Sequence, residues 1–332
     1  MSKYTILFTS SGGGLSAELR RRILNESKYN LNIIAVDAKD FPQAKIFANY
    51  FEKVPNGSDK NYSNAITNII NNYDVNLVIP CSDEEALNLS KNRSLFERKG
   101  CQLAAAEYDI LRIISNKLST YEFLEKKNFT VPNYLKVNTP SELERIIFNM
   151  LNNFKEIVVK PATGRGGRNV EIIGNESTDM GISADLFLHS KIQQYESLYP
   201  LIVMEKLKEP IYDIDILARD GKLIRSLVRR RLNPRKPNEG HIIEKNNELY
   251  QIAENLVKVF NLSWLYDCDF MINMSGEPLL LEINPRPSGS LAIALAAGIN
   301  FIDDLIALEK KDNLNNINIP FGKVIYPYSS LH

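Results

Sequence analysis

The segment 267–290, DCDFMINMSGEPLLLEINPRPSGS, restricts the fold more than any other part of the sequence. It predicts two strands, because apolar runs of strand length cover Asp267–Asn273 and Pro278–Ile283. The residues between these runs, Met274–Glu277, contain a Ser-Gly turn signal. The sequence therefore predicts a tight hairpin whose few polar side chains need an explanation.

Those polar side chains are Asp269 on the first strand and Glu282 and Asn284 at the end of the second. Glu282 and Asn284 are two residues apart, so an extended backbone turns both to one face of the sheet, where Asp269 can lie opposite them. Two carboxylates and an amide oxygen suit Mg²⁺ rather than zinc, and protein-bound Mg²⁺ usually accompanies nucleotide phosphates. The alternative is an ordinary exposed hairpin with charged rims.

The run Leu281–Arg286, followed by Ser288-Gly289, resembles the metal-binding signature of the ATP-grasp superfamily. It is most similar to the branch with carbamoyl-phosphate synthase large subunits, biotin carboxylase and stand-alone carboxylate–amine ligases. The resemblance implies an α/β protein in which a Rossmann-like pre-ATP-grasp domain precedes an ATP-grasp fold, whose two α+β subdomains clamp ATP. The expected boundaries are 1–112 for the Rossmann-like domain, 113–200 for the small subdomain with a Gly-rich lid, and 201–332 for the C-terminal subdomain with the Mg²⁺ site.

Composition agrees with several globular domains. The chain has 332 residues, more than one core comfortably holds. Its 40 basic and 40 acidic residues cancel, so nothing in the balance favours a nucleic-acid or membrane partner. The three cysteines have no metal-binding spacing and predict a reducing compartment. The first residues predict a strand without a leader, and the sequence holds no apolar stretch of membrane-spanning length, so we expect a cytoplasmic protein.

The first hundred residues predict a parallel sheet with helices on its faces. The turn Gly12-x-Gly14-x-x-Ala17, with Asp37 further on, satisfies a loose form of the dinucleotide-binding fingerprint, so a NAD-dependent oxidoreductase is an alternative from another class. The ATP-grasp resemblance implies instead that this domain lines the acceptor site without binding NAD. Gly12–Gly14, Asp37 and Asp83–Glu85 are then candidate substrate contacts. The acidic trio could equally be a solvated helix N-terminus.

A predicted strand, Glu156–Pro161, carries Lys160 at its end and leads directly into a loop with Gly164, Gly166 and Gly167. Such a lysine and the loop amides can surround phosphate, and the glycines allow the loop to close as a lid. The lysine precedes the glycines, so the loop is not a Walker-type P-loop. A mobile glycine-rich hairpin without function is the alternative. The resemblance adds Lys117, after Asn116 and before a predicted helix, as a second phosphate contact.

The resemblance also implies where the adenosine binds. Backbone groups of Glu205, Lys206 and Leu207 would hydrogen-bond the adenine edge, and Asp213 would hold the ribose hydroxyls. Apolar neighbours would sandwich the base, and we expect these to be Ile157, Val159 and Met204. The alternative for Asp213 and Asp215 is a half-buried edge strand with two solvated aspartates.

A basic strand follows, with Arg225, Arg229 and Arg231 on one face and Arg230 on the other. It predicts anion handling, although a solvated face is equally consistent. No histidine receives a catalytic role, because His241 has no partner in the sequence.

The expected function is an ATP-dependent carboxylate–amine ligase acting on an amino acid or small metabolite through an acylphosphate, with release of ADP and phosphate. Arg286 and Lys160 are the expected catalytic residues. ATP and two Mg²⁺ ions, replaceable by Mn²⁺, are the expected cofactors. The expected partners are small-molecule carboxylate and amine substrates and a second copy in a homodimer. The alternatives are an ATP-grasp kinase that stops at a phosphorylated product and the NAD-dependent oxidoreductase.

Overall fold

The computed structural model describes residues 3–97, 100–164 and 166–328. It divides into two compact units, of which the first contains residues 1–112, 210–269 and 283–332, and the second residues 113–209 and 270–282. Each unit is described by itself. Among the described residues, no helix has the length and apolar character needed to cross a membrane.

The first unit contains a five-stranded, all-parallel sheet in the order β3-β2-β1-β4-β5. Its strands are β1 (Tyr4–Phe8), β2 (Leu31–Asp37), β3 (Tyr50–Lys53), β4 (Leu77–Ile79) and β5 (Gln102–Leu103). The helices along this stretch are α1 (Ser16–Glu26), α2 (Pro42–Lys45), α3 (Tyr62–Tyr73), α4 (Asp83–Lys91) and α5 (Ser94–Glu97). The parallel sheet is consistent with the expected Rossmann-like domain. Because the chain reverses direction across the sheet between β1 and β4, the loops after these strands meet at the switch point where such sheets place ligands.

A second sheet of six strands has the order β15-β14-β11-β12-β13-β16. Its strands are β11 (Lys208–Arg219), β12 (Lys222–Arg231), β13 (His241–Ile243), β14 (Trp264–Ile272), β15 (Pro278–Asn284) and β16 (Val324–Ile325). The helices of this part are α10 (Asn247–Val259), α11 (Leu291–Ala296) and α12 (Phe301–Lys310). The predicted hairpin is therefore present as β14 and β15, and its turn clusters with the second unit.

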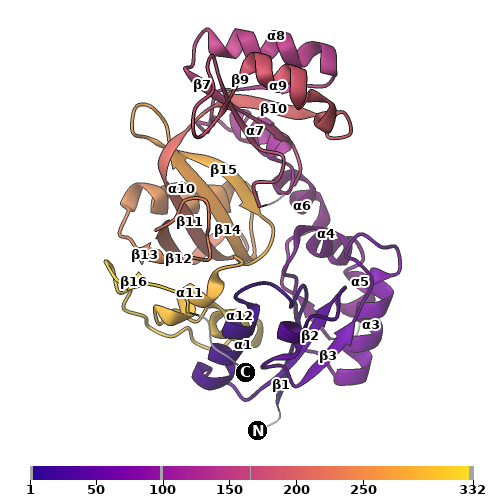
Figure 1. Ribbon diagram of the computed structural model, residues 1–332. Helices are drawn as coiled ribbons and strands as arrows, with labels where there is room; N and C mark the ends of the chain where they lie inside the picture. Colours follow the sequence, from indigo (N-terminus) through magenta and orange to yellow (C-terminus); the bar gives the residue numbers. More distant parts are fainter. Residues whose placement is uncertain (1–2, 98–99, 165, 329–332) are drawn as a thin grey trace. The chain divides into compact units, whose positions relative to one another are not determined.

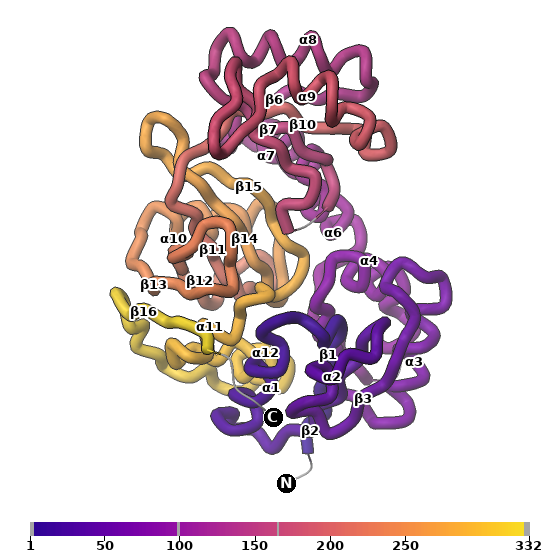
Figure 2. The backbone as a smooth tube through the Cα atoms, in the orientation of Figure 1, coloured from indigo at the N-terminus to yellow at the C-terminus, as the bar shows by residue number. Residues whose placement is uncertain are grey.

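The core of the first unit joins residues that are far apart in the sequence. Buried side chains of β1 and β2 pack in one cluster with those of α11 and α12. Figure 2 shows the N-terminal and C-terminal stretches lying side by side, where α1 contacts α11. Chain ends that share one apolar core explain why this unit is assembled from three separate stretches.

The second unit is built on a sheet in the order β6-β10-β7-β8-β9. Its strands are β6 (Tyr134–Val137), β7 (Glu156–Pro161), β8 (Glu171–Gly174), β9 (Ile182–Ser183) and β10 (Leu201–Glu205). Its helices are α6 (Tyr108–Ile114), which begins in the first unit, α7 (Lys117–Glu125), α8 (Pro140–Leu151), α9 (Ala184–Ser190) and the 3₁₀ turn η1 (Ile192–Tyr195). Helix α8 contacts β6, β7 and β10, and α9 contacts α8 and β8, so both cover one face of the sheet (Figure 1).

Candidate functional site

Lys117 lies where three predicted site elements of the second unit meet. The Asn116 side chain caps helix α7 by accepting from the Ser119 amide at 3.0 Å, which makes Lys117 the first helical residue. From there the Lys117 Nζ donates to the Gly164 carbonyl at 2.7 Å and pairs with Glu282 Oε2 at 2.7 Å. The structure thus brings together a predicted phosphate contact, the glycine loop and a predicted metal ligand.

Lys160 occupies the end of β7, where its side chain is buried. Its Nζ lies 3.3 Å from the Tyr121 hydroxyl and 5.6 Å from the centre of that ring. The same hydroxyl donates to the Leu281 carbonyl at 2.7 Å. Tyr121 therefore fixes the Lys160 ammonium close to β15, the strand that carries Glu282. A buried lysine at the end of a strand, directly before a glycine-rich loop, is placed where its ammonium group can contact an anionic ligand.

The glycines of the loop after β7 are required by backbone conformation. Gly164, Gly166 and Gly167 have φ angles of +123°, +66° and +68°. A Cβ atom built on any of them would meet no atom within 4 Å, so space does not explain the choice of glycine. The positive φ angles explain the choice of glycine, because a residue with a side chain is strained in that backbone conformation.

The segment predicted to hold adenine is fixed by its neighbours. Both the backbone amide and the side-chain amide of Asn133 donate to Glu205 Oε1 at 2.8 Å, and the Glu205 amide donates to the Asn133 carbonyl at 2.9 Å. The Lys206 amide donates to the Glu156 carbonyl at 3.2 Å, and its Nζ pairs with the Glu156 carboxylate. Leu207, the next residue along the chain, is buried in a cluster with Met204.

One detail of the adenine prediction is wrong. Ile157 and Val159 are fully buried in the cluster that packs against α8, so they do not line a base-binding face. Met204 lies in a different cluster with Val158 and Leu207. The physical reason is strand alternation, because Val158 shares the face of Lys160 whereas Ile157 and Val159 point to the other side.

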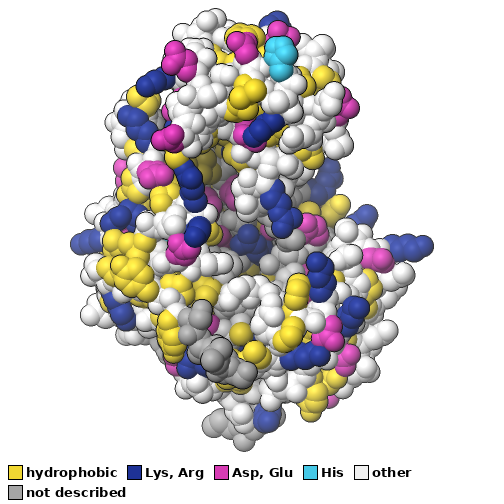
Figure 3. All heavy atoms as spheres, in the orientation of Figure 1, with side chains coloured by type: hydrophobic (Ala, Val, Ile, Leu, Met, Phe, Trp, Pro, Cys, Tyr) yellow, Lys and Arg dark blue, Asp and Glu magenta, His cyan; other side chains and the backbone are white. Residues whose placement is uncertain are grey.

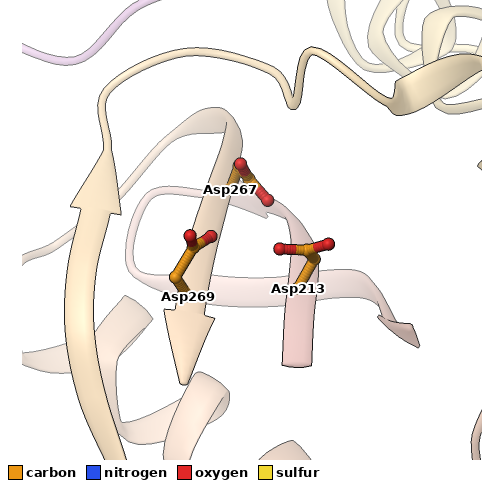
Figure 4. Close-up of side chains that lie close together, drawn as sticks. All are labelled: Asp213, Asp267 and Asp269. Atoms are coloured by element: carbon orange, nitrogen blue, oxygen red, sulfur yellow. The ribbon is translucent and has the colours of Figure 1, made fainter. Parts of the chain in front are cut away.

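In the first unit, three carboxylates converge (Figure 4). Asp213 on β11 and Asp267 and Asp269 on β14 each place an oxygen within 4.8 Å of the others. Arg231 on β12 bridges two of them, since it forms a two-pronged contact with Asp213 and donates from Nη2 to Asp269 Oδ2 at 2.7 Å. Like charges so close need such a cation. The basic face of β12 is therefore engaged in ion pairs within the protein, a possibility that sequence reasoning missed.

His241 also belongs to this cluster and is fully buried. Its Nε2 lies 2.6 Å from Asp213 Oδ2. Burial, followed by the charge of Arg229, lowers the pKa of His241 to about 4. The ring is therefore neutral near pH 7, and the short contact assigns its proton to Nε2. Burial would raise the pKa of Asp213, but hydrogen bonds from His241 and Arg231 hold it well below its usual range.

Asp213 and Asp215 are both fully enclosed on the central strand β11 and are not solvated aspartates on an edge strand. Asp215 accepts from Arg229 Nε at 2.7 Å and from its Nη2 at 3.0 Å, while Nη1 of the same guanidinium donates to Ser290 Oγ at 2.8 Å. This buried pair therefore anchors the loop that follows Arg286.

Arg286, the predicted catalytic arginine, is held by four groups of the first unit. Nη2 donates to Asn284 Oδ1 at 3.1 Å, Nη1 donates to the Pro287 carbonyl at 3.0 Å and lies 3.5 Å from Asp267 Oδ2, and Nε lies 3.4 Å from Asp83 Oδ1. Burial, followed by the nearby charge of Asp213, raises the pKa of Asp267 to about 7, with Arg286 opposing the shift. Asp267 was missed from the sequence, although it shares a strand face with Asp269.

The predicted metal ligands offer the chemistry that Mg²⁺ requires. Asp269 and Asn284 belong to the first unit and Glu282 to the second. All three provide oxygen atoms, and the Asp269 and Glu282 side chains retain 13 % and 21 % of their exposure. In the structure Arg231 and Lys117 neutralise these two carboxylates. Each of these oxygen donors suits a hard cation, and within the first unit Asp213 and Asp267 add negative charge beside Asp269.

Asp37 accepts hydrogen bonds from backbone amides of the N-terminal glycine turn and of its own loop. The Gly12 amide donates to Asp37 Oδ2 at 2.8 Å and the Lys39 amide to Oδ1 at 3.0 Å. A Cβ atom on Gly12 would come within 2.3 Å of the Phe41 ring, so close packing requires this glycine. The acidic residue of the dinucleotide fingerprint thus holds the turn itself.

The acidic trio after β4 is not a uniformly solvated helix end, because Glu85 is buried. Its Oε2 accepts from the hydroxyls of Thr9, Ser10 and Ser82 at 2.5, 2.7 and 2.8 Å. Burial raises the pKa of Glu85, and these hydroxyls oppose the shift. The carboxylate therefore joins the loops after β1 and β4 at the switch point of the parallel sheet.

Figure 3 shows basic and acidic side chains interspersed over the face that it draws. This mixture agrees with the cancelling totals of the sequence.

Comparison with solved structures shows the fold. A Staphylococcus aureus N5-carboxyaminoimidazole synthetase complexed with ADP aligns with a TM-score of 0.70 at 14 % identity, over 95 % of this chain and 80 % of that one. The biotin carboxylase domain of a Hydrogenobacter thermophilus 2-oxoglutarate carboxylase was solved with MgADP, ADP and bicarbonate. It aligns with a TM-score of 0.69 at 13 % identity, over 98 % of this chain and 74 % of that one. An L-amino acid ligase from Bacillus licheniformis aligns with a TM-score of 0.66 at 13 % identity, over 93 % of this chain and 74 % of that one.

Sequence comparison identifies the family. An uncharacterized Methanocaldococcus jannaschii protein is 25 % identical over 183 residues, which span 53 % of this chain and 42 % of that protein. Three family models match consecutive stretches of the chain. Residues 6–104 match the PylC-like N-terminal domain, residues 114–197 an ATP-grasp domain, and residues 197–322 the model described as ATP-grasp in the biosynthetic pathway with Ter operon. With the fold and these matches in agreement, the chain belongs to the ATP-grasp superfamily.

Proposed function

We propose that this protein is an ATP-dependent carboxylate–amine ligase that acts on an amino acid or a small metabolite. The observation that carries the proposal is the meeting of Lys117, Glu282 and the Gly164 carbonyl within one unit, beside the buried Lys160. Two lysines, a carboxylate and a glycine loop are the groups needed to bind the phosphates of a nucleotide. The solved structures of similar fold support the same class, since they include an amino acid ligase and complexes with ADP.

The proposed reaction has two steps. A substrate carboxylate oxygen attacks the γ-phosphorus of ATP, the bond to the ADP oxygen breaks, and an acylphosphate forms. The amine nitrogen then attacks the acyl carbon, phosphate leaves, and the amine loses a proton. Lys117 and Lys160 would neutralise the phosphate charge, and Arg286 would steady the transferred phosphoryl group. The buried Leu207 amide would donate to the adenine edge, and Asp213 would accept from the ribose.

Mg²⁺, held by Asp269, Glu282 and Asn284, would neutralise charge on the phosphate oxygens. We propose two ions, with Mn²⁺ as a substitute. We also propose a homodimer, cytoplasmic location and small-molecule substrates only.

A nucleotide-release assay tests this function. The protein is incubated with Mg·ATP and amino acids, singly and in pairs, and ADP and phosphate are measured. We expect both products only when a carboxylate and an amine substrate are present together. ADP release with one substrate would instead identify a kinase, and absence of any ATP-dependent product across the panel would contradict the proposal.

Two variants test the site once activity is found. We expect Glu282→Gln and Arg286→Ala to lower kcat by about 10²–10³-fold while the melting temperature stays near that of wild type. Glu277→Gln is the matched control, because Glu277 is exposed in the turn of the same hairpin. Near wild-type activity in either test variant would refute the site assignment.

A further inference from the structure

Asp267 is a buried carboxylate on β14, and no role follows for it from the proposed reaction. Its Oδ2 accepts a hydrogen bond from Asn284 Nδ2 at 3.2 Å and lies 3.5 Å from Arg286 Nη1. Both of these partners come from the end of β15 and the residues after it, where a metal ligand and a catalytic residue are proposed. Asp267 thus contacts two proposed site residues at once.

The contacts of Asn284 fix the direction of its amide group. An amide has an oxygen end that accepts and a nitrogen end that donates. The Asn284 oxygen accepts from Arg286 Nη2 at 3.1 Å, and its nitrogen donates to Asp267 Oδ2. A guanidinium can only donate, and Asp267 Oδ2, which also lies 3.5 Å from Arg286 Nη1, accepts from the Asn284 nitrogen. Both neighbours therefore impose the same orientation, and a flipped amide would lose both hydrogen bonds.

We propose that Asp267 is a positioning residue that makes Asn284 present its oxygen, and not its nitrogen, to a bound cation. The inference rests on the proposed function, in which Asn284 is a metal ligand. An amide nitrogen cannot bind Mg²⁺, so the orientation decides whether Asn284 is a ligand at all. Partners that orient metal ligands in this way typically change metal affinity about 10–100-fold when they are removed.

A different role for Asp267 is membership of a cation site with Asp213 and Asp269. The arrangement favours the positioning role, because the Arg231 guanidinium already bridges Asp213 and Asp269. Asp267 forms no contact with Arg231 in the described hydrogen bonds and ion pairs, and its Oδ2 faces Asn284 and Arg286.

The test compares wild type, Asp267→Asn and the double variant Asp267→Asn with Asn284→Asp. Mn²⁺ affinity is measured by electron paramagnetic resonance in the presence of a non-hydrolysable ATP analogue. We expect Asp267→Asn to weaken Mn²⁺ binding by up to about 10–100-fold, because an amide at position 267 accepts either orientation of Asn284 and the Arg286 contact alone then holds the oxygen end in place. The double variant should recover most of this loss, since the two oxygens of a carboxylate at 284 are equivalent and need no orienting partner.

The single variant Asn284→Asp is measured beside them, because a carboxylate at position 284 is by itself a stronger cation ligand than an amide. If Asp267 acts by orienting Asn284, Asp267→Asn should weaken Mn²⁺ binding when residue 284 is Asn and have little effect when residue 284 is Asp, whereas a merely structural role of Asp267 predicts the same loss in both backgrounds. Wild-type Mn²⁺ affinity in Asp267→Asn, or the same loss in both backgrounds, would overturn the inference. Glu282→Gln separates this failure from failure of the proposed function, because unchanged Mn²⁺ affinity in that variant would refute the metal site itself. Should Asp267→Asn not fold, Asp267→Ser takes its place, since a hydroxyl also both donates and accepts.

Discussion

At the scale of single residues, the Arg229–Asp215 ion pair has no exposed side-chain surface. Removal of one partner is therefore expected to lower the stability of the fold strongly. Arg229→Leu leaves the Asp215 carboxylate buried without its cation. We expect the free energy of unfolding to fall by about 3–5 kcal/mol, as for other buried pairs that lose one partner. Equilibrium unfolding in urea measures the change.

The control for this prediction is Arg229→Met combined with Asp215→Leu, which removes both charges. We expect the double variant to lie within about 1 kcal/mol of wild type, because no unpaired charge remains. A single variant as stable as wild type would show that the pair contributes nothing.

His241 predicts a pH dependence of stability. Its pKa is about 4 in the folded protein and about 6.5 in an unfolded chain. Between these two pH values the unfolded chain binds more protons at this histidine than the folded protein does. The free energy of unfolding therefore rises as pH increases through this range and falls as pH decreases. We expect His241→Asn to flatten this slope between about pH 4 and 6.5, as measured by urea unfolding at several pH values. His189→Asn, at an exposed histidine, should leave the slope unchanged.

Residues within one motif could be predicted from the sequence, whereas partners from separate strands could not. Spacing placed Glu282 and Asn284 on one face of a strand, and Lys160 next to its glycine loop. His241 reaches Asp213 only through the pairing of β13, β12 and β11, which no local pattern encodes. Asp267 was within reach, because it alternates with Asp269 on the same strand.

At the scale of elements, the glycine loop predicts a contrast between substitutions at one position. Gly166 has a φ of +66°, a conformation that asparagine tolerates and a β-branched residue does not. We expect Gly166→Asn to change the KM for ATP little and Gly166→Val to raise it about tenfold, reflecting strain of about 1–2 kcal/mol. Steady-state kinetics measures both. Equal KM values in the two variants would show that this loop conformation is unimportant for ATP binding.

Most strands and helices could be predicted from the sequence, since buried runs and turn signals mark them. The hairpin of β14 and β15 agrees with the prediction to within a few residues. The assignment of faces was wrong at β7, although the strand alternates. Glu156, Val158 and Lys160 share one face, whereas Ile157 and Val159 lie on the other and are buried in the cluster that packs against α8.

At the scale of the whole molecule, the boundary between the two units does not follow the order of the chain. The first unit collects three stretches, because α11 and α12 complete the apolar core of the N-terminal sheet. Contacts between such distant segments leave no local signal. The division into domains 1–112, 113–200 and 201–332 stays a prediction about how the chain is organised for function.

Ligand-induced stabilisation of the whole protein distinguishes the nucleotide classes. A ligand that binds only the folded state stabilises it by RT ln(1 + [L]/Kd), about 2.7 kcal/mol at a hundredfold excess over Kd. We expect Mg·ATP to raise the melting temperature and NAD to leave it unchanged, because Asp37 is already bonded to the glycine turn. Lys160→Met should abolish most of the Mg·ATP effect, since it removes a buried phosphate contact. Lys155→Met, at an exposed lysine just before the same strand, should retain the full effect. Stabilisation by NAD alone would move the nucleotide to Gly12–Gly14 and overturn the ligase proposal.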